Sequence, residues 1–244
     1  MKNQLKREIS FFGALSTVMG TVIGAGVFFK AAAVVEKTQA TGLTLFVWLL
    51  AGFLTICGGL TVAELATAIP ETGGPIRYIE RIYGKLLSFL LGWAQSVVYF
   101  PANIAALSII FATQLINLFH LSTGRLLPLA FCAAVSVTGI NLLGTKTAAG
   151  VQSLTLSVKL IPIALIILVG LLTPGKVEVS LLTMASSSST SWVAGVSSAL
   201  LATLFAYDGW LGVGNIAGEM KRPEKDLPKA IILGLSFVTI VYVL

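Results

Sequence analysis

The chain has 244 residues, of which 56% are hydrophobic and only 11% are charged. An average soluble protein carries roughly 25% charged residues, so this composition excludes a soluble protein and predicts one that is embedded in a lipid bilayer. The formal net charge of +6 would suggest nucleic-acid binding in a soluble protein. Here the basic residues lie in short loops between apolar segments, so we expect no nucleic-acid partner and attribute the charge to orientation in the membrane.

Seven apolar segments are long enough to span a bilayer, since a spanning helix needs about 20 residues. They are predicted at residues 9–35, 43–69, 86–119, 126–144, 151–172, 192–218, and from Lys229 to the last residue, Leu244. The third segment is too long for one upright helix, so we expect it to tilt, to extend beyond the bilayer, or to kink at Pro101. The segments 173–176 and 186–191 are predicted to belong to a flexible outer loop.

The distribution of lysine and arginine predicts the orientation of the chain. Eleven of these residues lie in the N-terminus and alternate loops, and three lie in the other loops. Because cytoplasmic loops are enriched in basic residues, the N-terminus is predicted to be cytoplasmic, in a multi-pass protein of the cell membrane. The remaining two fall within spans. Lys30 is near the outer end of the first span and can reach the interface, whereas Lys159 lies close to the middle of the bilayer.

The first span contains a predicted helix break. Gly20, Gly24 and Gly26 occur within seven residues, and each glycine costs a helix about 1 kcal/mol relative to alanine. Gly20 and Gly24 also have the spacing of small residues at helix contacts, so close helix packing is the alternative interpretation.

The sixth span contains a second predicted break, at residues 205–212, and it includes the ionisable Asp208. A charge at this depth costs some 2.5–3.5 kcal/mol on insertion scales and is a functional candidate, although a polar kink satisfied by neighbouring helices is the alternative. The two breaks lie five spans apart, so their helices run in opposite directions, as an inverted repeat requires. Paired broken helices of this kind indicate the binding site of a transporter.

Four motifs occur in the order found in one family of membrane transporters. Gly20–Phe28 resembles the G-x-G-[IV]-F signature of the amino acid–polyamine–organocation superfamily, and Ala63–Pro75 resembles its motif between the second and third spans. Leu204–Trp210 and Gly218–Lys225 resemble its sixth-span motif and the loop that follows. In detail, the four resemble the L-type amino acid transporter branch and, within it, a bacterial serine/threonine exchanger.

This resemblance implies an all-α integral membrane protein with a LeuT-like inverted-repeat fold. Residues 1–244 would form one transmembrane domain, with the first five-helix repeat at 9–173 and the start of the second, inverted repeat at 191–244. Members of the superfamily have about twelve spans, whereas this chain ends within the seventh. We therefore expect the chain to be inactive by itself and unstable outside a longer parent.

The resemblance also implies where a substrate binds. The amides of Gly24, Ala25 and Gly26 would hold a carboxylate at the start of the outer half-helix, whose dipole favours an anion. Carbonyl groups around the breaks would hold the ammonium group, and these belong to Val22, Ile23, Phe205, Ala206 and Asp208. Phe205 or Tyr207 would close over the substrate, and the small residues Ala25 and Gly209 leave side-chain specificity open.

Two positions depart from the family pattern. Ala25 stands where many relatives have serine, which removes a hydroxyl contact but keeps the amide. Asp208 stands where many animal L-type relatives have glycine. It could contact the substrate, orient the unwound backbone or pair with another polar group, and we favour a structural or gating role.

Four further charged residues have roles implied by the resemblance. Lys159 would supply a tethered positive charge in place of Na⁺ and link the fifth helix to the first, which leads to the hypothesis that it sets the inward/outward equilibrium. Glu219 and Arg222 would belong to an inner gate. Glu64, near the inner face, is a further candidate for this gate, either as a member of a buried network, which we favour, or as a charge at the membrane interface.

These features predict a sodium-independent transporter of small neutral L-amino acids, most simply an exchanger. The alternatives are a proton-coupled symporter, a carrier of cationic substrates, and a non-transporting sensor or assembly subunit. A cationic carrier would need more acidic groups than Asp208.

No catalytic, metal-binding or cofactor-binding arrangement is predicted, so we do not expect an enzyme. Residues 120–125 lack the cysteine by which animal L-type relatives bind a heavy chain, so no covalent heavy chain is expected.

Overall fold

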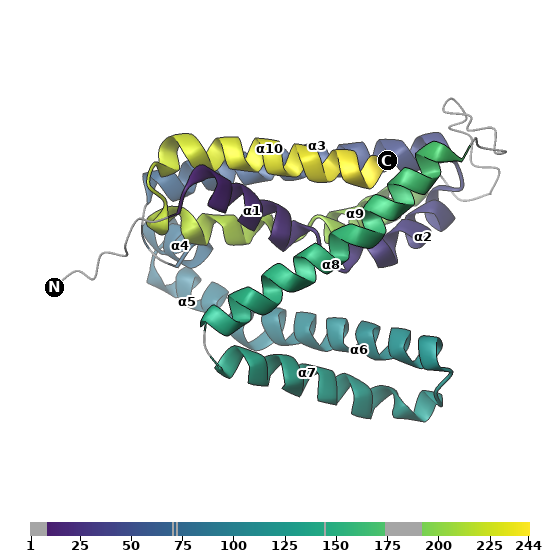
Figure 1. The fold of residues 1–244 in the computed structure, drawn as a ribbon. Helices are drawn as coiled ribbons and strands as arrows, with labels where there is room; N and C mark the ends of the chain where they lie inside the picture. Colours follow the sequence, from purple (N-terminus) through teal and green to yellow (C-terminus); the bar gives the residue numbers. More distant parts are fainter. Residues whose placement is uncertain (1–8, 70, 72, 144, 174–191) are drawn as a thin grey trace. The chain divides into compact units, whose positions relative to one another are not determined.

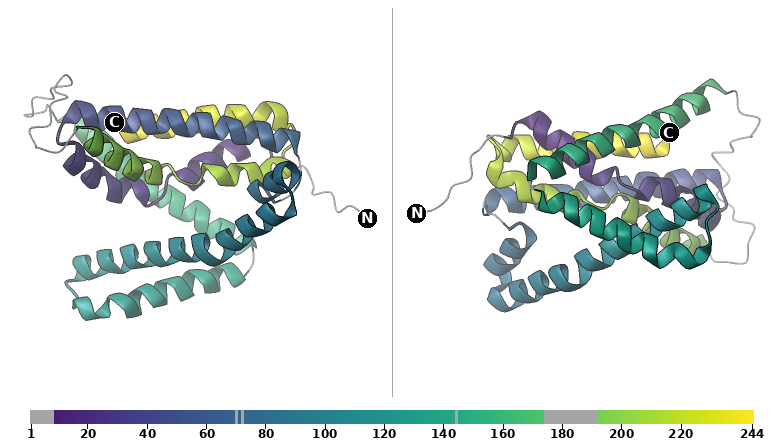
Figure 2. Two further views of the ribbon diagram at one scale, coloured as in Figure 1. Left: turned by 180° about the vertical axis from the view of Figure 1, so that it is seen from behind. Right: turned by 60° about the horizontal axis from the view of Figure 1, so that its bottom comes forward.

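The computed structural model describes residues 9–69, 71, 73–143, 145–173 and 192–244, although the side chains of a few helical residues within these ranges, Glu219 among them, lie outside the description. The secondary structure of the described residues is helical apart from one isolated parallel bridge, between Ile9 and Met220. The described residues form two compact units, one within 9–78 and 158–244 and one within 79–157 (Figures 1 and 2). Both predicted helix breaks lie in the first unit.

The first span consists of two helices separated by a break. α1 covers Phe11–Val22 and α2 covers Gly26–Thr38, and the two axes are bent by 50°. Ser10 caps α1, because its side chain accepts a hydrogen bond from the amide of Gly13 at 3.4 Å. The prediction of a break near the glycines of this span is confirmed.

Two long helices, α3 (Thr41–Ala68) and α10 (Pro223–Val243), pack side by side in the first unit (Figure 1). Gly59 allows this approach, because a Cβ atom there would lie 2.7 Å from Cγ2 of Ile231. α1 packs on α10 in the same way, where Gly234 faces Val18. The core of the unit is therefore built on close helix contacts at glycine, as is usual for membrane helices.

The sixth span is also interrupted. α9 covers Trp192–Ala206, a turn follows, and a 3₁₀-helix, η3, covers Trp210–Glu219. Gly209 adopts a left-handed conformation with φ = 112°, which favours glycine. The predicted break is confirmed, but the segment beyond it is a 3₁₀-helix. This segment contains three glycines in ten residues, which weaken an α-helix.

The helix α10 begins six residues earlier than predicted. It starts at Pro223 rather than near Lys229, and the charged residues of its first turns led the sequence analysis to assign them to a loop. Proline is well suited to the first turn of a helix, and Glu224 and Asp226 there interact favourably with the helix dipole.

A short helix, α4 (Pro75–Tyr83), also lies within a predicted loop, and Tyr78 anchors it to the first unit. The Tyr78 hydroxyl is 3.5 Å from the carbonyl oxygen of Gly214. Burial raises the pKa of Tyr78 above its usual value, so the hydroxyl keeps its proton at neutral pH. The anchor therefore joins the segment after α3 to the segment after the second break.

The second unit contains the third and fourth spans. α5 (Lys85–Ala94), a π-helical turn η1 (Gln95–Tyr99) and α6 (Phe100–Phe119) form one continuous span of 35 residues. The π-helical turn ends just before Pro101, so the irregularity predicted at this proline lies in the turn that precedes it. After a short 3₁₀-helix, η2 (Thr123–Arg125), α7 (Leu126–Leu142) lies beside α6 (Figures 1 and 2).

The helix α8 (Thr145–Leu172) begins in the second unit and continues into the first. Within the described residues, five helices are long and apolar enough to cross a membrane, or six if α1 and α2 count as one span. The described part of α9 is a shorter apolar helix. The chain is therefore a multi-pass membrane protein. The loop predicted around residues 186–191 lies outside the described residues.

Candidate functional site at the two helix breaks

The two breaks contact each other although they are about 180 residues apart in the sequence. A Cβ atom on Gly26 would lie 2.6 Å from Cα of Ala206, and a Cβ atom on Gly209 would lie 2.6 Å from the carbonyl oxygen of Thr21. Any side chain at either glycine would therefore force backbone apart. The structure thus brings the predicted site residues of the first and sixth spans into one place.

The first break carries backbone donors that have no backbone acceptor. Within the described part of the chain, the amides of Gly24, Ala25 and Gly26 donate to no backbone carbonyl. Ala25 stands at the N-cap of α2 and offers no capping side chain. Amides at the start of a helix attract anions, because the helix dipole adds to their partial positive charge. These three amides can therefore hold a carboxylate.

The carbonyl groups next to both breaks accept hydrogen bonds from one side chain. The hydroxyl of Tyr242, on α10, lies 3.2 Å from the carbonyl oxygen of Val22 and 3.3 Å from that of Ala206. These two residues end α1 and α9, so Tyr242 joins both broken helices to α10. Tyr242 is not among the residues predicted for the site. A signal was present, since a tyrosine inside an apolar helix needs a partner for its hydroxyl.

Tyr242 belongs to a buried aromatic cluster with Trp48 and Tyr207. The ring centroids of the three are 5.1–6.1 Å apart, and the Tyr207 hydroxyl donates to the carbonyl oxygen of Trp48 at 3.2 Å. Tyr207 is fully buried, whereas the side chain of Phe205 is 38% exposed. Of the two residues expected to close over a substrate, only Phe205 has an exposed face in this structure.

Lys159 reaches the first break from α8. Its side chain is half-buried, and its Nζ atom donates to the carbonyl oxygen of Ile23 at 3.4 Å. Ile23 is the first residue after α1, and its side chain is buried. The ammonium group of Lys159 therefore lies beside the unwound backbone.

Asp208 closes the turn in the second break. Its amide donates to the carbonyl oxygen of Phe205 at 3.2 Å, and its side chain is half-buried. Gly209 follows with the positive φ that ends the turn. Both residues lie in the non-α-helical segment that separates α9 from η3.

The three residues predicted for an inner gate are less well defined. Glu64 is exposed, so the expectation that it belongs to a buried network is wrong. The buried face of α3 at this level carries Ala63 and Ala66, and Glu64 points away from it. Arg222 is exposed at the N-cap of α10, and the side chain of Glu219 lies outside the described part of the chain.

Replacing Tyr242 with phenylalanine is expected to loosen both breaks. The change leaves two buried carbonyl groups without the hydroxyl donor, which costs about 1–3 kcal/mol. The measurement is the thermal unfolding of the protein in detergent micelles. Tyr207→Phe is the comparison, because it removes the same atom from the same cluster but affects one carbonyl group, that of Trp48, in place of two at the breaks, so we expect it to lower the unfolding temperature less. Equal unfolding temperatures for the two variants would contradict the bridging role of Tyr242.

These features define a multi-pass membrane protein with a polar site formed by the backbone of two broken helices. Residues 9–244 match the family model of the amino acid permeases, and the chain belongs to this family. The prediction from the four sequence motifs is thereby confirmed.

Several transporters resemble the chain over almost its full length. It is 45% identical to the serine/threonine exchanger SteT of Bacillus subtilis (strain 168) over 241 residues, which are 99% of this chain and 54% of SteT. It is 33% identical to the human large neutral amino acids transporter small subunit 2 over 247 residues, which cover 98% of this chain and 46% of that protein. The human Asc-type amino acid transporter 1 is 32% identical, with coverage of 98% and 47%.

The chain spans about half the length of these relatives. The family and the named relatives are permeases and transporters rather than enzymes, which agrees with the expectation from the sequence. The resemblance to the L-type branch is likewise confirmed.

Proposed function

We propose that this chain forms the substrate-binding part of a sodium-independent exchanger of small neutral L-amino acids. The observation that carries the proposal is the contact between the two breaks, where Gly26 meets Ala206 next to three amides that donate to no backbone carbonyl. A zwitterion offers a carboxylate for such amides and an ammonium group for nearby carbonyls. Lipid offers neither, so an unwound membrane helix needs such a partner.

The proposed binding mode assigns a role to each break. Gly24, Ala25 and Gly26 hold the carboxylate of the substrate through their amides. The carbonyl oxygens of Val22, Ile23, Phe205, Ala206 and Asp208 are the candidates for the ammonium group. A carbonyl oxygen has two lone pairs, so one that accepts from Tyr242 or Lys159 can still accept from a substrate. Phe205 covers the substrate, while Asp208 and Gly209 maintain the turn.

The proposed architecture is a LeuT-like inverted repeat in the cell membrane, with a cytoplasmic N-terminus. Residues 9–173 form the first repeat, and residues 191–244 form the start of the second. The opposite directions of the two broken spans and the excess of basic residues in alternate loops support this proposal. The exchanger works without a covalent heavy chain, because residues 120–125 contain no cysteine.

Lys159 takes the role that Na⁺ has in sodium-dependent transporters with this architecture. Its Nζ atom lies 3.4 Å from the carbonyl oxygen of Ile23, so a positive charge already lies at the break. The same contact supports a second candidate function, proton-coupled symport, in which loss of the proton from Lys159 would weaken the contact. Exchange and symport differ in what drives uptake.

The test is uptake of radiolabelled L-serine into proteoliposomes that contain the 244-residue chain and, in parallel, the full-length product of its gene if that is longer. We expect uptake by the full-length product and none by the 244-residue chain alone, and we expect this uptake to require unlabelled amino acid inside the vesicles. Uptake driven by a proton gradient with empty vesicles would favour symport. Binding of L-serine without uptake by either protein would contradict transport and indicate a sensor or an assembly subunit.

A further inference from the structure

The half-helix α2 packs against α9 along a seam that begins at the two breaks (Figure 1). At one end Gly26 meets Ala206, and further along Nζ of Lys37 donates to the carbonyl oxygen of Ser198 at 3.3 Å. Residue numbers rise along α2 while they fall along α9, so the two helices are antiparallel. Any residue on this face of α2 that lies one turn beyond Gly26 is therefore close to the end of α9.

Lys30 is that residue. It lies four positions after Gly26 and hence on the same face of the helix. Its Nζ atom is 4.9 Å from the ring centroid of Phe205, which is a cation–π contact. Phe205 immediately precedes Ala206, against which the first break packs. A positive charge thus lies against the side chain of a residue whose carbonyl group belongs to the proposed binding site.

We propose that Lys30 sets the charge selectivity of the site by excluding amino acids with positively charged side chains. This inference rests on the proposed function. The segments 20–28 and 205–212 contain one carboxyl group, that of Asp208, and no basic side chain, so Lys30 is the positive charge held against them. Like charges about 10 Å apart in a medium of effective dielectric constant about 20 repel enough to change an affinity roughly tenfold. Lys30 therefore disfavours a positively charged side chain at the proposed site and leaves the binding of neutral side chains unaffected.

The contact with Phe205 keeps the charge of Lys30 close to the proposed binding site. A lysine side chain that is free to extend reaches water, where its field is screened. Here the ammonium group rests on an aromatic ring, and this ring belongs to the residue that covers the proposed site. The contact therefore holds the ammonium group of Lys30 beside the side chain that is proposed to cover the substrate.

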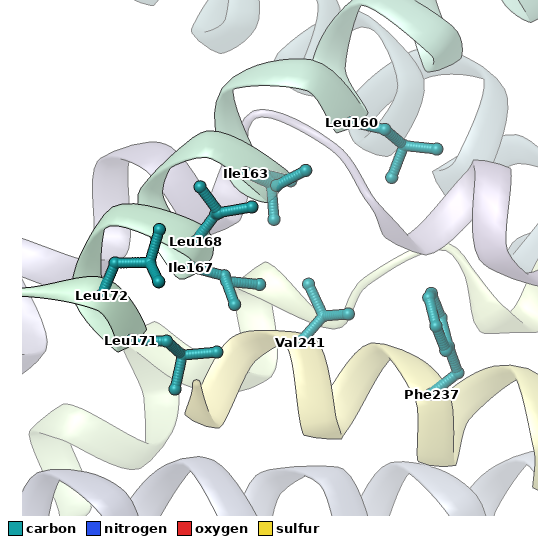
Figure 3. Close-up of a pocket in the computed structure, with 9 residues that line it drawn as sticks. Leu160, Ile163, Ile167, Leu168, Leu171, Leu172, Phe237 and Val241 are labelled. Atoms are coloured by element: carbon teal, nitrogen blue, oxygen red, sulfur yellow. The ribbon is translucent and has the colours of Figure 1, made fainter.

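The wide apolar groove between α8 and α10 carries no such assignment. Its volume is about 490 Å³, and its lining side chains are apolar, among them Ile163, Ile167, Phe237 and Val241 (Figure 3). Its nine lining residues offer no polar side chain that could recognise an amino acid.

The experiment measures displacement of radiolabelled L-serine by L-arginine and by L-threonine, with the purified full-length product of the gene in lipid nanodiscs. The quantity of interest is the ratio of the inhibition constant of L-arginine to that of L-threonine. Lys30→Met is expected to lower this ratio roughly tenfold, by the repulsion it removes. Lys30→Arg should keep the ratio, because a guanidinium retains the charge and stacks on aromatic rings.

Lys37→Met is the matched control, because it removes a positive charge from the same helix, two turns further from the breaks. Its ratio should equal that of the unaltered protein. A ratio within twofold of the unaltered value in Lys30→Met would overturn the inference, and so would equal changes in Lys30→Met and Lys37→Met. Absence of L-serine binding in the unaltered protein would overturn the proposed function and this inference with it. L-serine binding with an unchanged ratio would overturn the inference alone.

Discussion

Replacing Gly26 with alanine is expected to separate the two breaks and to abolish binding of L-serine. The added Cβ atom would lie 2.6 Å from Cα of Ala206, which is backbone and cannot rotate away. Overpacking of this kind costs about 1–3 kcal/mol and occasionally more. Relief requires α2 and α9 to move apart, and such a movement displaces the amides at the start of α2 from the carbonyl groups at the end of α9.

The measurements for this variant are its thermal unfolding in detergent micelles and the affinity of the protein for radiolabelled L-serine. Gly24→Ala is the control for stability, because its Cβ atom would come no closer than 3.8 Å to another atom outside its immediate neighbours. We expect Gly24→Ala to unfold near the temperature of the unaltered protein. If Gly26→Ala unfolds at the same temperature as Gly24→Ala, the contact between the breaks does not stabilise the fold.

Replacing Lys159 with methionine is expected to reduce amino acid exchange at least tenfold. The change keeps an unbranched side chain, one atom shorter, and removes the charged donor to the carbonyl oxygen of Ile23. A hydrogen bond to a charged group contributes about 1.5–3 kcal/mol, and 1.4 kcal/mol corresponds to a factor of ten. Without the donor, the first break is free to adopt other arrangements, and the balance between inward and outward states changes.

The measurement is the initial rate of L-serine exchange in proteoliposomes over a range of pH. Lys159→Arg retains a positive charge and serves as the control. Its exchange rate is expected to lie between the rate of Lys159→Met and that of the unaltered protein. If exchange also depends on the protonation of Lys159, the methionine variant should lose that part of the pH dependence. An unchanged rate and an unchanged pH profile in Lys159→Met would show that the lysine does not couple the break to transport.

The spans and the two breaks could be predicted from the sequence because their signals are local. A run of apolar residues predicts a membrane helix wherever it lies, and glycines weaken a helix regardless of its neighbours. Reliance on local hydropathy also explains why α10 was predicted to begin near Lys229 when it begins at Pro223. Its first turn is charged, and hydropathy does not distinguish a charged helical turn at a membrane surface from a loop.

The contacts that connect the breaks could not be predicted in this way. Whether Tyr242 faces the breaks or the lipid depends on how α10 is rotated about its axis, and this rotation is set by its packing on α1 and α3. The same holds for Lys30, which the sequence analysis assigned to the membrane interface and which the structure places over Phe205. For Glu64 a buried network was favoured over an interfacial charge, and its side chain is exposed, because the sequence does not show which face of α3 is buried.

The arrangement around Tyr242 has a consequence for how such a chain can change over generations. Its hydroxyl has one proton, yet it lies within hydrogen-bond distance of the carbonyl groups of Val22 and Ala206, which belong to two different helices. A mutation at this one codon therefore disturbs both halves of the site together, and a compensating mutation in α1 or α9 alone repairs only one half. Genetic suppressors of Tyr242→Phe should accordingly map to helices that touch both breaks, or occur as pairs.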